Sequence, residues 1–117
     1  MNVRQVDPAP AVVGAFMALA AGLFLAEPFV SPIPLGGQPV PIAAFSFVAL
    51  AIALDLGAVL FYWQGERTAA MVHGVAGAGW TLLVLGPALG SGLIWFLGLD
   101  VVIGGAVFLF VETIRRP

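Results

Sequence analysis

The sequence contains no cysteine and no lysine, and it has one histidine and one tyrosine. The lack of cysteine excludes disulfide bonds, thiolate metal ligands and cysteine nucleophiles. A single histidine cannot supply both axial ligands of a bis-histidine haem within one chain. The four arginines form no long basic run and the net charge is −2, so the electrostatic basis for nucleic-acid binding is missing. We therefore expect no cofactor, no metal site and no nucleic-acid partner.

Charged residues are scarce throughout the chain. Only 9% of the 117 residues are Asp, Glu, Lys or Arg, whereas 62% are hydrophobic. A soluble domain normally has about a quarter of its residues charged, and a water-facing surface this apolar would aggregate. We therefore expect this chain to lie in a lipid bilayer and to have lipid as a partner.

Four long apolar runs divide the sequence. A helix needs roughly 20 apolar residues to cross the hydrocarbon core of a bilayer, and such runs occupy residues 10–27, 42–63, 68–86 and 91–112. The runs lack the alternation of membrane β-strands and are about twice their length. The sequence therefore predicts an all-α integral membrane protein, with residues 1–117 forming a single four-helix transmembrane bundle.

The arginines predict the orientation of this bundle. Arg4 precedes the first run, Arg67 lies between the second and third, and Arg115 and Arg116 follow the fourth. Short cytoplasmic loops carry the excess of Lys and Arg in membrane proteins. We therefore expect a multi-pass protein of the cell membrane with both termini cytoplasmic. The first run is longer than the apolar core of a usual signal peptide, so we expect it to be retained as a span.

The segment between the first two runs is expected to be a loop. It contains five prolines and the pair Gly36–Gly37, which forbid a continuous helix. Glu27 marks the end of the first span at the start of this loop. Inside the spans, Ser46 and Thr81 are expected to bond to carbonyl groups of their own helices.

Small residues recur at a spacing of four in two of the runs. These residues are Gly14, Ala18 and Gly22 in the first run, and Ala70, Gly74 and Ala78 in the third. Each set lines one helix face, and helices in lipid associate through close packing at such positions. Each set is expected to serve either ordinary packing within the bundle or contact with another subunit.

Three ionisable residues, Asp55, His73 and Asp100, lie well inside the predicted spans. An Asp at a helix centre costs about 2.5–3.5 kcal/mol on the insertion scale, so it needs a partner, water or a proton. Helical rise places Asp55 about 13 Å and His73 about 9 Å above the turn that joins their spans. Because these spans should be antiparallel neighbours, the two side chains are expected within reach of each other. Asp100 can join them only if the fourth span packs beside the second.

This set of residues allows three interpretations. In the first, the three residues form a proton or cation pathway. In the second, Asp55 and His73 form a structural pair while Asp100 bonds to nearby backbone. In the third, Asp100 contacts a partner subunit. Tyr62 and Trp80 each follow one of these residues by seven positions and share its helix face. They are the aromatic residues expected to face a ligand, if one binds.

Catalytic signatures are missing. No nucleophile set of Ser, His and Asp and no glycine-rich phosphate motif occurs, so we predict no catalytic residue and no enzyme. The leading interpretation is a non-catalytic subunit of a larger membrane complex, respiratory or ion-translocating, with other subunits or a second copy as partners. The alternative is a small proton- or cation-coupled transporter that acts as a homo-oligomer. The third is a quinone- or lipid-binding membrane subunit whose site is built from His73, Trp80, Tyr62 and the acids Asp55 and Asp100.

Overall fold

The computed structural model describes residues 7–116, and within them four helices are long and apolar enough to cross a membrane. The helices are α1 (Pro8–Ala26), α2 (Ile42–Trp63), α3 (Arg67–Ala88) and α4 (Gly92–Arg115). The all-α class and the expected number of membrane-length helices are confirmed. Helix α1 begins two residues earlier than expected, and α3 and α4 end two and three residues later.

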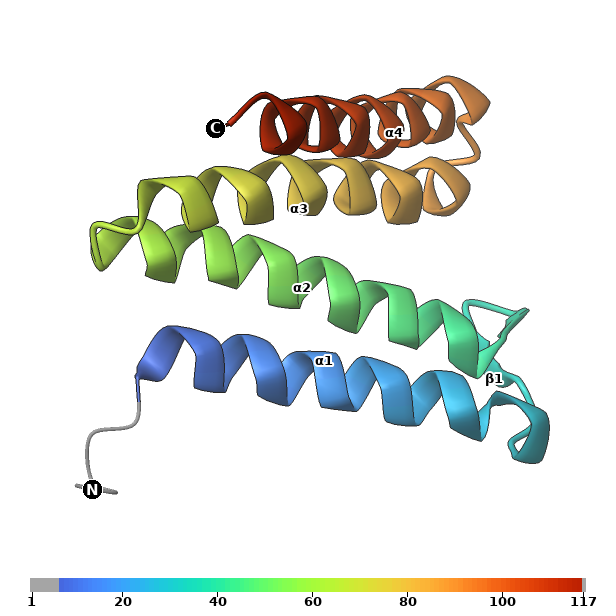
Figure 1. Cartoon of the computed structure of the whole chain (residues 1–117). Helices are drawn as coiled ribbons and strands as arrows, with labels where there is room; N and C mark the ends of the chain where they lie inside the picture. The colour runs from blue at the N-terminus through green and yellow to red at the C-terminus, as the bar shows by residue number, and fades with distance from the viewer. Residues whose placement is uncertain (1–6, 117) are drawn as a thin grey trace.

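The four helices lie side by side in chain order (Figure 1). Helix α2 packs against α1 and α3, and α4 packs against α3 and not beside α2. The molecule measures 50 × 38 × 23 Å, which is flat for a protein with helices of this length. The bundle is therefore an open single layer with α1 and α4 at its two edges, and no large side chain among residues 7–116 is fully buried.

The connection between α2 and α3 is tight because a glycine ends the helix. Gly65 has a φ of 80°, and the N–H of Glu66 donates to the carbonyl of Phe61 at 2.9 Å. This bond closes the helix end in the Schellman geometry. Gly90, with a φ of 66°, repeats the arrangement between α3 and α4. Consecutive helices are therefore antiparallel neighbours, as the sequence predicted for the second and third spans.

Helix α3 continues beyond Gly86, where the sequence predicted its end. It runs through Pro87 to Ala88, because a proline in the last turn does not by itself stop a helix that a following glycine can close. The N–H of Ser91 donates to the carbonyl of Gly86 at 2.8 Å. The Ser91 hydroxyl then accepts from the N–H of Ile94 at 3.2 Å, so one residue closes α3 and caps α4.

The proline-rich segment after α1 holds more structure than the expected loop. A short 3₁₀ helix, η1 (Glu27–Phe29), is followed by the strands β1 (Ile33–Leu35) and β2 (Gln38–Val40), which pair as an antiparallel hairpin. Gly36 and Gly37 have φ values of 57° and 78°. Two positive φ angles in a two-residue turn give the type I′ geometry that favours such hairpins.

Two side chains tie α1 to the first half of α2. Helix α2 begins after Pro41 without a capping side chain of its own, and Glu27 Oε2 accepts from the N–H of Ala43 at 2.6 Å. A carboxylate is favourable at a helix N-terminus, where backbone N–H groups lack partners. The buried Ser46 hydroxyl donates to the carbonyl of Ala20 on α1 at 2.7 Å. The prediction that Ser46 bonds to its own helix is therefore wrong.

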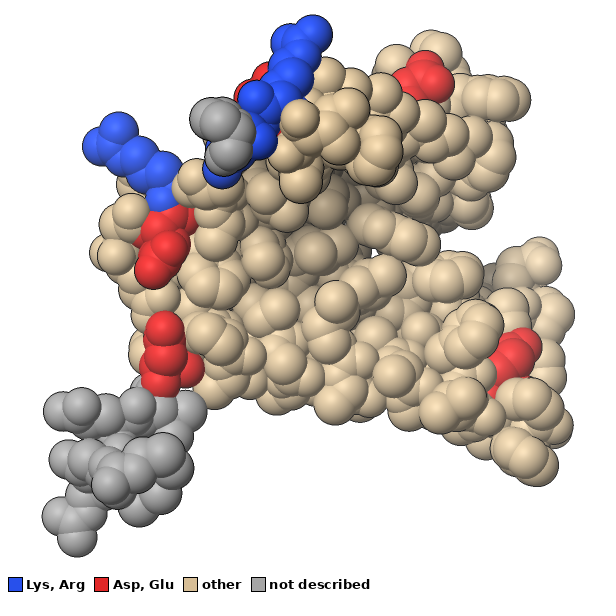
Figure 2. Space-filling model, in the orientation of Figure 1, with Lys and Arg blue, Asp and Glu red and all other residues tan. Residues whose placement is uncertain are grey.

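The opposite end of the layer gathers the described arginines. Helix α3 begins at Arg67, and α4 ends at Arg115, which Arg116 follows; Figure 2 shows the blue side chains on the left and upper side of the view. At this end Asp7 accepts from the N–H of Ala9 at 3.2 Å and from Gln64 Nε2 at 2.5 Å. Asp7 therefore caps α1 and joins it to the end of α2. Arg4 lies outside the described residues.

We expect Glu27→Ala to lower the free energy of unfolding by about 1 kcal/mol, the usual loss when a helix cap is removed. Glu27→Gln keeps an acceptor oxygen and should retain part of that stability. Titration of the purified protein with a denaturing detergent measures both effects. Glu66→Gln changes an exposed carboxylate and serves as the control; equal losses at positions 27 and 66 would contradict the capping role.

Candidate functional site

Asp55 lies against α3, and a glycine there makes room for it. The Thr81 hydroxyl donates to Asp55 Oδ2 at 2.8 Å, so the prediction that Thr81 bonds to its own helix is wrong. Gly77 lies one turn before Thr81 on the same face of α3. A Cβ at Gly77 would collide with the Asp55 carboxylate and come within 3.1 Å of its backbone N. Asp55, Gly77 and Thr81 therefore form one contact between α2 and α3.

This contact lies close to the middle of the layer. Helix α2 extends from Ile42 to Trp63, which puts Asp55 about 4 Å from the helix midpoint at 1.5 Å per residue. The Asp55 side chain is exposed. A carboxylate at this depth has a single hydrogen-bond donor in the described part of the chain and an open side that faces the surroundings.

His73 contacts a different part of α2. Its ring lies 4.9 Å from the Phe61 ring, measured between centroids, and rests on Gly57, where a Cβ would be 2.5 Å from His73 Cδ2. His73 Nδ1 is 2.8 Å from the carbonyl oxygen of Ala69. Because a carbonyl can only accept, Nδ1 is the donor of this bond.

Asp55 and His73 are not bonded to each other, although both lie between α2 and α3. Among residues 7–116, the hydrogen bond of Asp55 goes to Thr81 and that of His73 goes to Ala69. Asp55 and Gly57, on which His73 rests, are about 200° apart around α2. The carboxylate and the imidazole therefore make separate contacts between the two helices.

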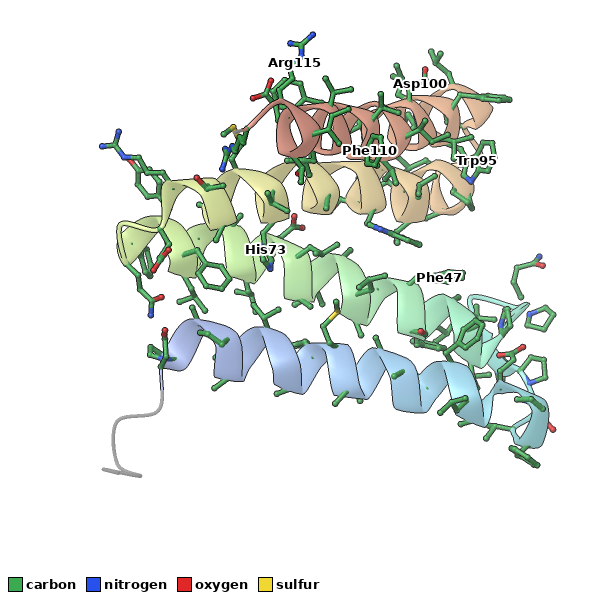
Figure 3. All side chains as sticks on the ribbon, in the orientation of Figure 1. Phe47, His73, Trp95, Asp100, Phe110 and Arg115 are labelled. Carbon is green, nitrogen blue, oxygen red and sulfur yellow. The ribbon has the colours of Figure 1, made fainter. Side chains whose placement is uncertain are left out.

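Asp100 lies apart from both residues. It is exposed on α4, about 12 Å from the helix start at Gly92, and Figure 3 shows it on the outer side of α4 while His73 lies between α3 and α2. Helix α4 packs on α3 rather than beside α2. The condition for a cluster of Asp55, His73 and Asp100 is therefore not met within one chain.

The two expected ligand-facing aromatics lie at different cavities. The Trp80 ring is 5.8 Å from the Phe47 ring, and both line a pocket of about 300 Å³ with Trp95. Tyr62 lines a separate groove near the opposite end of α3. His73 lines neither of these two cavities. These aromatics therefore do not build one ligand face with the histidine.

The small-residue set of α1 faces away from the rest of the protein. Gly14, Ala18 and Gly22 are exposed, and nothing lies within 4 Å of a Cβ placed at either glycine. The residues that α1 buries are Ala9, Val13 and Ala20. In the set on α3, Ala70 is buried and Ala78 is exposed, while Gly74 is only in ordinary contact with α2.

The closest packing occurs at glycines that the spacing of four did not select. Gly79 faces α4, where a Cβ would come within 2.5 Å of Val102, and Gly98 of α4 faces back onto the Gly79 carbonyl at 2.8 Å. Gly86 lies against Trp95, with Trp95 N 2.7 Å from the position of a Cβ. Neither the spacing of four nor the presence of a glycine in a span identified these positions, because Gly14 and Gly22 have nothing within 4 Å of a Cβ.

No protein-family model, curated protein or solved structure matches this chain. Within the described residues, no three His, Asp or Glu side chains gather closely enough to hold a metal ion. The four apolar helices indicate a multi-pass membrane protein. Its polar side chains form separate contacts at mid-layer rather than one assembled site.

We expect Gly77→Ala to lower the free energy of unfolding by about 1–3 kcal/mol, the usual cost of adding a methyl group to a tightly packed site. Gly74→Ala is the matched control, because a Cβ there would lie an ordinary 3.7 Å from Ala58 Cβ. Titration with a denaturing detergent compares the two variants. If Gly77→Ala is as stable as Gly74→Ala, Asp55 does not need the space at Gly77.

Proposed function

We propose that this chain is a non-catalytic subunit of a larger assembly in the cell membrane, with both termini cytoplasmic. The observation that carries the proposal is the uncovered stripe of Gly14, Ala18 and Gly22 on α1. Small side chains in line let a second helix approach closely in lipid. Within the described part of the chain this stripe has no helix against it, so another protein is its natural partner.

The opposite edge of the layer supports the same proposal. Asp100 is exposed on α4 in the apolar part of the helix, where lipid chains offer no hydrogen bond. Polar side chains at this depth usually face protein or water. Large apolar side chains surround it on α4, including Phe96 and Ile103. A partner that supplies a donor to Asp100 would remove the cost of leaving the carboxyl in hydrocarbon.

The arrangement of charge supports the proposed orientation. Arg67 begins α3 and Arg115 ends the antiparallel α4, so these arginines belong to the same end of the layer, whereas residues 28–41 at the other end contain no basic residue. Short cytoplasmic loops of membrane proteins carry the excess of arginine. The end that holds the α2–α3 turn is therefore the cytoplasmic one in this proposal.

Ala18→Phe tests the proposal, because the added ring would keep a partner helix from the stripe. We expect the wild-type chain, extracted from its native membrane in mild detergent, to elute with other subunits at a constant ratio. Ala18→Phe should reduce that association at least tenfold. Leu19→Phe adds a ring at a neighbouring exposed position and serves as the control.

Two results would overturn the subunit proposal. One is a wild-type chain that elutes alone from its native membrane. The other is equal association of Ala18→Phe and Leu19→Phe with the partner subunits. A complex that contains only copies of this chain would favour the second candidate function instead.

The second candidate is a small proton- or cation-coupled transporter that acts as a homo-oligomer. The contact between Asp55 and Thr81 favours it, because an exposed carboxylate lies near mid-layer with one hydroxyl donor. Intramembrane carboxylates commonly mark ion pathways. Asp100 of one copy can complete a pathway only by reaching Asp55 or His73 of another copy.

Flux measurements test this second candidate. In liposomes, the transporter predicts a pH-dependent proton or cation flux that Asp55→Asn lowers at least tenfold. Glu66→Gln removes a carboxylate in the α2–α3 turn and should leave the flux unchanged. Wild-type liposomes without flux, or equal flux in Asp55→Asn and Glu66→Gln, would exclude the role of Asp55 in transport.

A further inference from the structure

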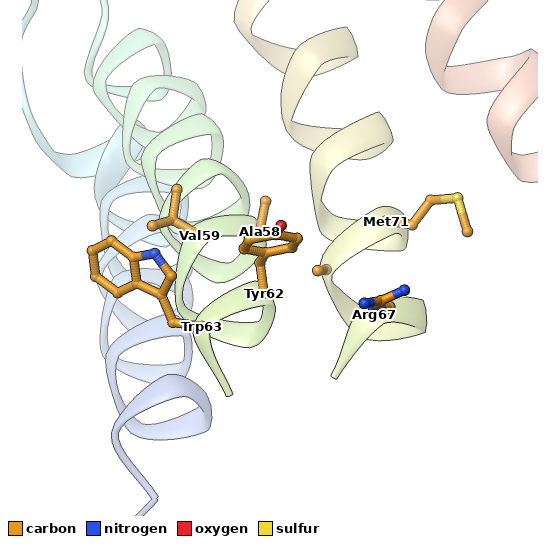
Figure 4. A pocket seen from close by; sticks show the side chains of 7 residues that line it. Ala58, Val59, Tyr62, Trp63, Arg67 and Met71 are labelled. Atoms are coloured by element: carbon orange, nitrogen blue, oxygen red, sulfur yellow. The ribbon is translucent and has the colours of Figure 1, made fainter. Parts of the chain in front are cut away.

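An open groove of about 680 Å³ lies between the end of α2 and the start of α3 (Figure 4). Its rim is formed by Tyr62, Trp63 and Arg67. Tyr62 and Trp63 are 67% and 76% exposed, so both rings are available to a ligand. Aromatic rings and arginine at a helix end are typical of the level at which lipid headgroups lie.

The inner part of the groove is apolar. Ala58 and Val59 line it from α2, and Ala70 and Met71 line it from α3. These residues lie further from the α2–α3 turn than the rim does, toward the middle of the layer. The groove therefore has a charged and aromatic entrance followed by a hydrocarbon-like channel, which is the polarity of a phospholipid.

Arg67 supplies an available positive charge at this entrance. It is exposed, so its guanidinium is accessible to a ligand at the entrance of the groove. Glu66, the preceding residue, is also exposed. A guanidinium binds phosphate through two parallel N–H donors, and it attracts anionic lipid at a membrane surface.

We propose that this groove binds an anionic phospholipid. The lipid phosphate lies on the Arg67 guanidinium, the headgroup lies beside Tyr62 and Trp63, and one acyl chain follows Val59 and Met71 toward mid-layer. The charge of Arg67 and the apolar channel below it select this occupant. The inference goes beyond the proposed function and does not depend on it.

Fluorescence quenching of Trp63 tests the site directly. Trp80→Phe and Trp95→Phe leave Trp63 as the only tryptophan, and lipids with brominated chains quench it on contact. In vesicles we expect brominated phosphatidylglycerol to bind at least threefold more tightly than brominated phosphatidylcholine. Arg67→Gln should weaken phosphatidylglycerol binding about fivefold, whereas Arg115→Gln, with the same change of charge, should not.

Lipid adducts counted by native mass spectrometry on the chain with all three tryptophans give the same comparison, in case the tryptophan substitutions disturb folding. Three results would overturn the proposal. They are equal effects of Arg67→Gln and Arg115→Gln, displacement of the lipid by soluble glycerol phosphate, and protection of Trp63 from every brominated lipid by a second copy of the chain.

Discussion

Lipid gives helices no hydrophobic reason to associate, so the interfaces of this layer depend on how closely two backbones can approach. Glycine sets that approach. The Asp55 carboxylate occupies the space at Gly77, the His73 ring occupies the space at Gly57, and Val102 occupies the space at Gly79. Each of these side chains would have to move if its glycine carried a Cβ. The positions of Asp55 and His73 therefore depend on the glycines opposite them.

Length and charge were enough to predict the helices, but they could not predict how the helices turn toward one another. The four apolar runs located the spans, and Gly65 explains why the turn between α2 and α3 is tight. Depth alone suggested that Asp55 and His73 meet, whereas the side on which each contacts its neighbour depends on Gly77 and Gly57. Which face of a helix packs against its neighbour depends on both helices of the interface. The spacing of residues along one helix does not determine it.

The same limit applies to the small residues and to the last helix. A spacing of four identifies a face on α1, but it does not say that Gly14 and Gly22 face outward. The sequence also left open whether the fourth span lies beside the second or the third. The short connection through Gly90 and the fit of Gly98 against Gly79 place α4 on α3. Asp100 is thereby carried to the edge of the layer, away from Asp55.

The contacts between helices that are consecutive in the chain have a consequence for biogenesis. Every extensive interface joins helices that are consecutive in the sequence. Closing the short loops between them therefore costs little conformational entropy. Because chains are made from the N-terminus onward, the helix on which each new helix packs has already been synthesised when the new helix leaves the ribosome. Nascent α2 can settle on α1 through Ser46 before α4 has been synthesised. Assembly can thus proceed vectorially, one helix at a time.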